Sequence, residues 1–157
     1  MKNVLKLIAS ILFSLGAGVI GSFFTASSVS TWYQTIQKPS FNPPSWVFSP
    51  VWTILFIMMG VALYLVWKEG LREKKVKIAF IIFWVQLVLN TLWSVLFFGL
   101  QSPLYALVEI IFLWVAIFIT IIWFSRVSKK AAYLLIPYLL WVSFATILNF
   151  AIFYLNI

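Results

Sequence analysis

Long, continuous apolar stretches dominate this chain, and short polar segments separate them. A helix needs about 20 residues to cross a hydrocarbon core of about 30 Å. Because the stretches are apolar on all sides, they do not show the alternating segments of about ten residues that are typical of a membrane β-barrel. The pattern therefore predicts an all-α integral membrane protein, a bundle of five transmembrane helices at about 5–25, 46–67, 78–98, 104–124 and 131–154.

The first stretch has a second interpretation as a signal peptide. Lys2 and Lys6 precede an apolar run, and the residues at 26–28 are small. The apolar run is nevertheless longer than the 7 to 15 residues of a usual signal-peptide core. We therefore interpret 5–25 as the first transmembrane helix.

The composition limits the class of protein and the chemistry. Of 157 residues, 64% are hydrophobic and only 9% are charged, against about 25% charged residues in a soluble domain. We expect one transmembrane domain, 1–157. The chain has no His and no Cys, which excludes Ser-His-Asp and Cys-His nucleophiles, disulfides, a zinc cluster and haem bound through His or Cys. We expect no metal site.

The basic residues predict the orientation. Ten of the eleven lie on the side of the N-terminus and the loops at 68–77 and 125–130, and Lys38 alone lies on the other. The positive-inside rule places the N-terminus in the cytoplasm and the C-terminus outside, in a bacterial plasma membrane. The net charge of +8 would suggest nucleic acid in a soluble protein, but here the expected partner is the lipid bilayer and not nucleic acid.

The segment 26–45 is the one long loop, and its mixture of aromatic residues and proline is too stiff and apolar for a flexible linker. Long loops in compact domains are often functional lids, so we expect a lid over the outer mouth of the bundle. The following helix has two candidate starts, with Ser45 as N-cap, or with Ser49 as N-cap and Pro50 at the first helical position. The depth of Trp52 depends on which is correct.

Polar residues form a layer in the outer half of the predicted helices. Asn90, Glu109 and Asn149 lie roughly 8 to 12 Å below the outer helix ends at a rise of about 1.5 Å per residue. Because unpaired polar groups are costly in hydrocarbon, they should face one another or a cavity. For Glu109, the alternatives are a protonated carboxyl bonded to a neighbouring helix, a proton relay or a ligand contact. For the two amides, they are interhelical hydrogen bonds or pocket lining.

Helical spacing places aromatic residues beside this polar layer. Steps of three and four put each of two sets on one helix face: Gln86, Asn90, Trp93 and Phe97, and Tyr138, Trp141, Ala145 and Asn149. Trp52, Trp93 and Trp141 lie on or next to these faces, and Trp32 lies in the loop above. Flat side chains around a few polar groups suit a flat aromatic ligand.

The first helix carries small residues at every fourth position, namely Ser10, Ser14, Gly18 and Ser22. Such a ladder lets another backbone approach closely. It is compatible with packing inside the bundle or with dimerisation, and we favour packing inside the bundle.

Several motifs in order give the chain a resemblance to the translocator protein family, also called tryptophan-rich sensory proteins or peripheral-type benzodiazepine receptors. The resemblance covers Trp32 to Asn149. Its motifs are Trp32-Tyr33, Lys38-Pro39-Ser40, Pro43-Pro44, Pro50-Val51-Trp52, Tyr64-Leu65-Val66-Trp67-Lys68-Glu69, Gln86-Leu87-Val88-Leu89-Asn90, Trp93-Ser94, Phe97-Phe98, Ala106-Leu107-Val108-Glu109, Pro137-Tyr138-Leu139 and Leu148-Asn149.

The resemblance implies a five-helix bundle, often a homodimer, with a pocket under the first long loop that binds porphyrins and aromatic drugs. It implies that Trp52 and Trp141 line this pocket and take part in light-dependent oxidative degradation of bound porphyrin, and that Trp32, Asn90 and Ala145 match pocket positions. With the spacing argument, the candidate ligand-binding set is Trp32, Trp52, Asn90, Trp93, Phe97, Tyr105, Glu109, Trp141, Ala145 and Asn149. No permanently bound cofactor is expected, since the porphyrin would be a ligand or substrate.

Two departures from the animal members bear on this implication. After Tyr154 the sequence continues with Leu155, Asn156 and Ile157, whereas the sterol-recognition segment of the animal members ends in a basic residue, so the resemblance does not imply sterol binding there. Tyr105 stands where those members carry Trp. Three functions remain open at this point. They are a porphyrin-binding or sensory protein, an enzyme in which photoexcited porphyrin and oxygen react near an indole, and a transporter that uses Glu109 as an intramembrane polar gate.

Overall fold

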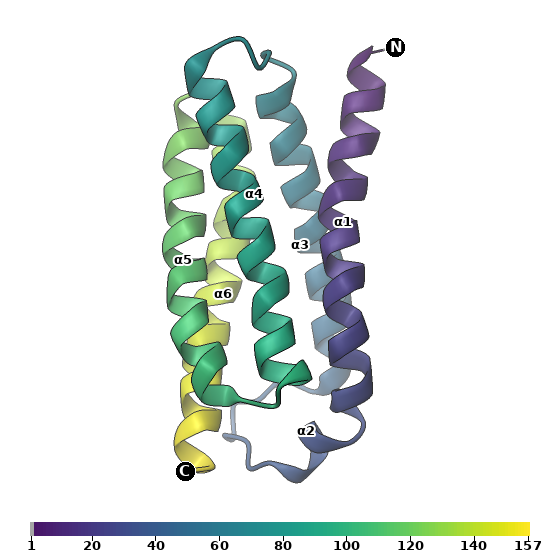
Figure 1. The fold of residues 1–157 in the computed structure, drawn as a ribbon, viewed down its shortest axis with the longest axis vertical. Helices are drawn as coiled ribbons and strands as arrows, with labels where there is room; N and C mark the ends of the chain where they lie inside the picture. The colour runs from purple at the N-terminus through teal and green to yellow at the C-terminus, as the bar shows by residue number, and fades with distance from the viewer. Residues whose placement is uncertain (1) are drawn as a thin grey trace.

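Five long helices run side by side along one axis (Figure 1). The computed structural model describes residues 2–157, and within them every regular element is helical. Each of the five is long and apolar enough to cross a membrane, with a π-helical turn extending the third of them to Gly99. The predicted five-span helical membrane protein is confirmed. The elements are α1 (Lys2–Val29), α2 (Trp32–Thr35), α3 (Ser45–Trp67), α4 (Lys74–Ser94), η1 (Val95–Gly99), α5 (Pro103–Ser125) and α6 (Lys129–Leu155).

Local sequence signals account for several helix ends. The hydroxyls of Ser102 and Ser128 accept hydrogen bonds from the backbone N–H groups at the starts of α5 and α6, as N-cap residues do. Pro44 is the residue before α3, and neither predicted start of that helix is correct in detail. Ser45 is its first helical residue and not the cap, and the alternative start at Ser49 is wrong because the helix already includes Pro50. Trp52 consequently lies two turns inside α3.

The helices form a ring in the order α1, α3, α6, α5, α4, and α4 closes the ring by contacting α1. The half of the bundle nearer the N-terminus is close-packed. There Phe83 of α4 stacks on Phe124 of α5 with ring centroids 5.8 Å apart, and Met59 and Leu63 of α3 are fully buried. The hollow part of the bundle lies in the other half, towards α2.

Three of the four ladder residues of α1, Ser10, Ser14 and Gly18, pack inside the bundle as expected, whereas Ser22 is exposed. A Cβ atom added to Gly60 of α3 would lie 2.5 Å from Cα of Ile11, so the two backbones touch. Gly18 faces the ring of Phe56, and Gly21 faces Ser94 of α4. Ser10 and Ser14 are fully buried.

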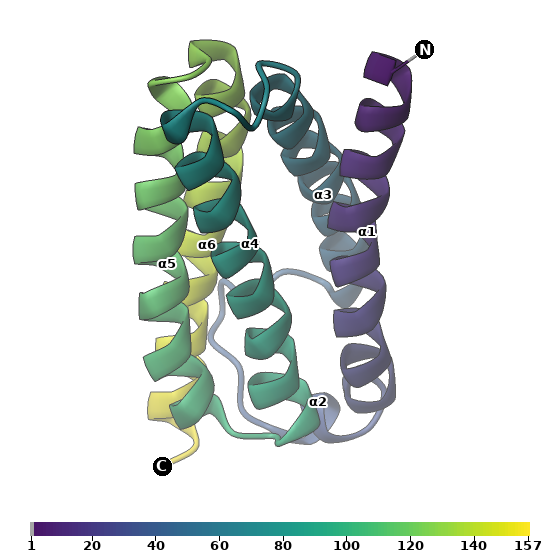
Figure 2. The same ribbon diagram turned by 45° about the horizontal axis from the view of Figure 1, so that its top comes forward.

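The segment 30–44 connects α1 to α3 across the end of the bundle opposite the N-terminus, and we call it the cap segment (Figure 2). It is shorter than the predicted loop 26–45 because α1 continues to Val29, and it contains the helical turn α2. Asn156, just after α6, holds it with two hydrogen bonds to the backbone of Gln37, of 3.0 and 2.9 Å.

The cap segment also has its own internal contacts. Tyr33 is buried against Phe97 and Phe98, and its hydroxyl donates to Oδ1 of Asn42 at 2.7 Å. Burial raises the pKa of this hydroxyl above 10.0, against the opposing effect of the Asn42 hydrogen bond, so it remains a donor at neutral pH. Lys38 Nζ donates to the carbonyls of Tyr33 and Ile36.

Candidate functional site

A cavity of about 570 Å³ occupies the half of the bundle next to the cap segment. Residues of α1, α3, α4, η1 and α6 line it, and Tyr33 closes it from the cap segment. Its volume is within the range of about 300 to 1,000 Å³ that is typical of small-molecule sites. α5 contributes no residue to the lining.

Three indoles from three different helices face this cavity. Trp52 of α3 stacks on Phe56 at 5.6 Å and an interplanar angle of 29°. Trp93 of α4 stacks on Phe97 at 5.1 Å and 21°. Trp141 of α6 packs against Phe48 edge-on at 6.1 Å. Aromatic contacts thus position each indole, and the contacting rings of Phe48, Phe56 and Phe97 line the same cavity.

A buried hydrogen-bond network fixes the polar side of the cavity. Asn90 Nδ2 donates to the hydroxyl of Tyr138 at 2.9 Å, and this hydroxyl donates to Oε1 of Gln86 at 2.9 Å. The ring of Tyr138 contacts Trp52 edge-on at 6.3 Å. Asn90 therefore forms an interhelical hydrogen bond and also lines the cavity. Both roles considered for this amide apply at once.

A second amide, Asn149, ties the cavity wall to α4 and α5. Its Oδ1 accepts from Trp93 Nε1 at 3.1 Å, and its Nδ2 donates to the carbonyl of Pro103 at 2.8 Å. In contrast, Nε1 of Trp141 is buried and has no hydrogen-bond partner among residues 2–157. Buried polar groups in folded proteins are almost always paired, so this N–H group is an exception among the described residues.

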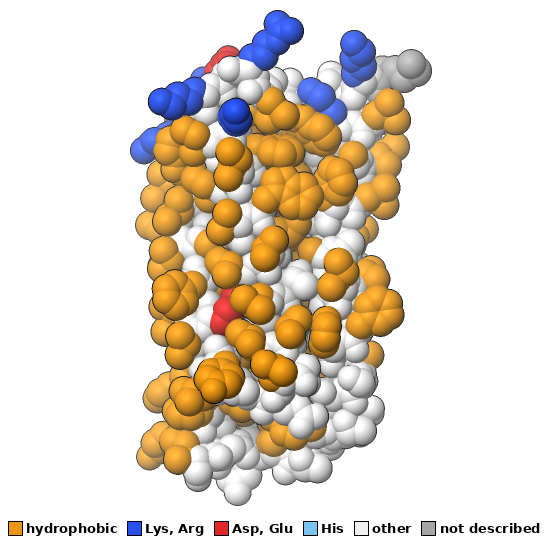
Figure 3. Space-filling model, viewed as in Figure 1, with side chains coloured by type: hydrophobic (Ala, Val, Ile, Leu, Met, Phe, Trp, Pro, Cys, Tyr) orange, Lys and Arg blue, Asp and Glu red, His pale blue; other side chains and the backbone are white. Residues whose placement is uncertain are grey.

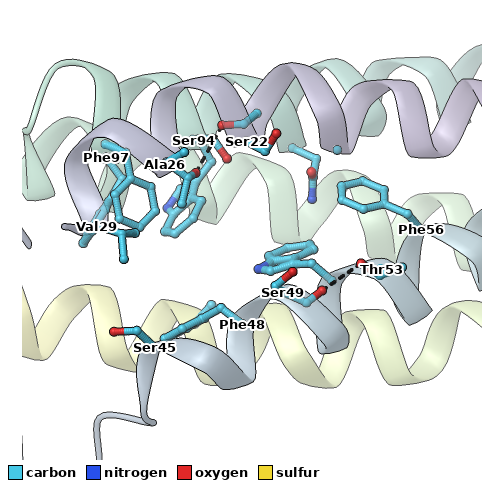
Figure 4. A pocket seen from close by; sticks show the side chains of 18 of the residues that line it. Ser22, Ala26, Val29, Ser45, Phe48, Ser49, Thr53, Phe56, Ser94 and Phe97 are labelled. Atoms are coloured by element: carbon cyan, nitrogen blue, oxygen red, sulfur yellow. Dashed lines mark hydrogen bonds between the residues drawn. The ribbon is translucent and has the colours of Figure 1, made fainter.

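The cavity opens sideways between α1 and α3 (Figure 4). Every exposed residue of its lining lies on these two helices or just after α1, and most of them are small. Ser22 and Ala26 lie on one side of this opening, and Ser45, Ser49 and Thr53 on the other. Because α1 and α3 are both candidate membrane spans, the opening faces the lipid.

The structure brings seven of the ten predicted ligand-binding residues to this one cavity. Trp32 contacts Phe97 edge-on at 5.6 Å but is not part of the lining. Tyr105 and Glu109 lie away from the cavity because both belong to α5, and Tyr105 is 62% exposed. The seven lining residues are Trp52, Asn90, Trp93, Phe97, Trp141, Ala145 and Asn149.

Glu109 occupies an apolar site on α5. The side chain is buried, and neither carboxyl oxygen has a hydrogen-bond partner among the described residues. The interhelical hydrogen bond expected for it is therefore absent from this part of the chain. No group of three acidic residues comes together anywhere in 2–157 to hold a metal ion.

Sequence reasoning missed the contribution of α1 and of the start of α3. The row of small residues on α1 continues beyond the packed positions to Ser22 and Ala26. At these two positions it lines the opening of the cavity and does not contact another helix. The spacing of small residues along a helix does not show where they stop packing against another helix and become exposed. Phe48 of α3 was missed because its depth depended on the uncertain helix start.

Comparison with known proteins gives consistent matches over the whole chain. The model of the TspO/MBR family matches residues 10–155. The chain is 52% identical over 155 residues to the tryptophan-rich protein TspO of Archaeoglobus fulgidus, covering 98% of this chain and 99% of the relative. It is also 52% identical over 155 residues to the protein of that name from Chlorobaculum tepidum, covering 99% and 98%. To the human translocator protein it is 42% identical over 141 residues, covering 88% and 82%.

Proposed function

Because this chain belongs to the TspO/MBR family of membrane proteins, we propose that its cavity binds a porphyrin of the protoporphyrin type, or another flat aromatic molecule, as a binding or sensory protein. The observation that carries this proposal is the arrangement of Trp52, Trp93 and Trp141 around one cavity of about 570 Å³. Indole faces from three helices offer stacking surfaces to a planar ring.

The polar groups of the cavity suit the few polar atoms of such a ligand. Asn90 uses its Nδ2 for Tyr138, which leaves its carbonyl as an acceptor for a pyrrole N–H. Lys38 donates two hydrogen bonds within the cap segment, and its third proton can pair with a ligand propionate or with a lipid phosphate.

Light-dependent degradation of the porphyrin would be a consequence of binding in this position. The photoexcited ring and oxygen would supply the chemistry, and the protein would supply orientation and a nearby oxidisable indole. Trp52 and Trp141 are the candidates for this role, because both face the cavity from the neighbouring helices α3 and α6.

The orientation and the assembly belong to the same proposal. Lys and Arg side chains gather at the end of the bundle where the chain begins (Figure 3), which supports an N-terminus in the cytoplasm and a C-terminus outside, in a bacterial plasma membrane. We also infer a homodimer from the family resemblance, and native mass spectrometry of the purified protein would measure it.

The test is titration of the purified protein with protoporphyrin IX in the dark, followed by tryptophan fluorescence and porphyrin absorption. We expect saturable quenching that weakens in the double variant Trp52→Phe, Trp141→Phe. The matched control is Trp84→Phe, Trp123→Phe, which removes the same number of indoles outside the cavity and should retain the affinity.

Illumination of the same samples separates binding from degradation. Light-dependent loss of the porphyrin spectrum that is slower in the cavity variant than in the control variant would support the degradative role. Quenching that does not saturate, or that weakens equally in both double variants, would refute a porphyrin site in this cavity.

A further inference from the structure

A second hollow lies on the outside of the bundle, between α1 and α4. It is a shallow groove of about 530 Å³, and all its lining residues except Thr91 are apolar or glycine. It shares only Ala17 with the cavity described above. Its floor includes Gly16, where an added Cβ would meet no atom within 4 Å. The groove therefore has room for an apolar chain along the membrane-spanning direction.

Two lysines lie in line with this groove at the basic end of the bundle. Lys6 precedes Phe13 of the groove by seven residues on α1, and Lys77 precedes Trp84 of the groove by seven residues on α4. Seven residues return to nearly the same helix face, with a drift of about 20°. The rise of two turns is roughly 10 Å, which is close to the depth of about 5 to 8 Å of the headgroup region on each side of a bilayer.

Aromatic contacts connect Lys6 to the groove and fix its position. Lys6 Nζ lies 5.8 Å from the ring of Trp67 and donates to its carbonyl at 3.3 Å. From Trp67, ring contacts continue through Phe80 to Trp84, which meets Phe13 at 5.2 Å. The ammonium group is thus held at Trp67, at the end of α3, from which ring contacts lead to the groove, and it retains protons for a further acceptor.

The charges at this end favour an anion. Among residues 2–157, no acidic side chain forms an ion pair with Lys6 or Lys77, since the one ion pair there joins Lys75 to Glu73 at 3.2 Å. A second copy of the chain in the same membrane has its own basic end at the same surface, so its lysines would repel this pair. A lipid with an anionic headgroup can instead place an acyl chain in the apolar groove and its negative charge near both lysines.

We propose that the α1–α4 groove binds one acyl chain of an anionic phospholipid, whose phosphodiester pairs with Lys6 and Lys77. This site is separate from the proposed porphyrin cavity and does not depend on its function. The lipid would cover Gly16 and the exposed edge of Trp84, and it would join α1 to α4 at the basic end.

Native mass spectrometry of the full chain in detergent tests the proposal. The probes are dioleoyl phosphatidylglycerol and dioleoyl phosphatidylcholine, which have the same acyl chains and differ in headgroup charge. We expect a one-to-one adduct with a preference for phosphatidylglycerol of about tenfold or more, because each lysine near an anionic headgroup contributes about a factor of five.

Matched variants assign the adduct to this groove. Lys6→Gln with Lys77→Gln should remove the preference. Because the double variant also loses the contact of Lys6 with Trp67, which could perturb folding, the single variant Lys77→Gln at an exposed position is a second test, and it should lower the preference. Lys129→Gln with Lys130→Gln removes the same charge at the start of α6 and should retain the preference. Gly16→Leu, which favours the helix over glycine, should weaken both lipid adducts by filling the groove.

Two outcomes would overturn the proposal. Equal loss of preference in both lysine pairs would mean that only the overall charge of this end matters. A Gly16→Leu variant that changes the proportion of dimer and leaves the phosphatidylglycerol adduct unchanged would mean that a second copy occupies the groove.

Discussion

The indole N–H of Trp93 on α4 donates to Oδ1 of Asn149 on α6, at 3.1 Å. The same amide donates to the carbonyl of Pro103 at the start of α5, at 2.8 Å. One side chain thereby joins three helices and sets the angle of an indole that faces the cavity. Asn149 couples the stability of the bundle to the shape of the candidate site.

Replacing Asn149 by Ala should therefore destabilise the protein and weaken porphyrin binding together. The change leaves the Trp93 N–H and the Pro103 carbonyl without their partner, at a cost of about 1 to 3 kcal/mol. Thermal unfolding in detergent and the porphyrin titration would measure the two effects. Asn3→Ala, an exposed change near the start of α1, is the control, and an unfolding midpoint equal to that of the control would contradict the role of Asn149.

Gly60 should not tolerate a side chain, because α1 and α3 touch there. A Cβ at this position would lie 2.5 Å from Cα of Ile11, and a backbone atom cannot move aside as a flexible side chain can. We expect Gly60→Ala to destabilise the protein by about 1 to 3 kcal/mol. Gly16→Ala, on the open groove, should be neutral or stabilising, since alanine favours the helix.

Thermal unfolding of both glycine variants under the same conditions checks this contrast. Equal midpoints for the two would show that α1 and α3 do not pack as closely as the structure places them.

The sequence predicted the five helices and much of the cavity because those features depend on local patterns. Apolar length determines the spans, and spacing placed Asn90 and Trp93 on one face of α4 as it placed Trp141 and Asn149 on one face of α6. Both faces meet at the cavity. Depth alone grouped Glu109 with them, but depth does not say which helices are neighbours. In the structure α5 lies between α4 and α6, on the side away from the cavity.

The start of α3 shows a different limit of the sequence. Ser49 followed by Pro50 is a good helix start, yet the helix begins five residues earlier, after Pro44. Pro50 lies in the second turn, where Thr53 Oγ1 donates to the carbonyl of Ser49 at 2.8 Å. Two local signals of similar strength competed, and in the longer helix Phe48 packs against Trp141.

The two hydrogen bonds between Asn156 and Gln37 should limit local opening of the cap segment. Asn156→Ala removes both hydrogen bonds to Gln37. Since such bonds contribute about 1 kcal/mol each, the amide hydrogen of Gln37 should exchange with solvent at least about fivefold faster. Hydrogen exchange measured by mass spectrometry over 30–44 would detect this, with 68–73 at the other end as the internal reference. Unchanged exchange at Gln37 would mean that other contacts hold the segment.

Glu109 separates the binding function from the transport alternative. Its side chain is buried on α5 without a hydrogen-bond partner among the described residues, and it does not line the cavity. We therefore expect Glu109→Gln to leave the porphyrin affinity unchanged in the quenching titration. The uncharged amide has a similar shape, so the stability should also change little, by less than about 1 kcal/mol.

The transport alternative makes the opposite prediction for Glu109, since a polar gate needs an ionisable group on the path of the substrate. Porphyrin uptake into liposomes containing the protein distinguishes the two. Uptake that the protein accelerates and that Glu109→Gln abolishes, at unchanged affinity, would establish a gate outside the cavity and would require a path along α5. Uptake at the rate of protein-free liposomes for both forms would leave binding in the α1–α3–α4–α6 cavity as the function that this geometry serves.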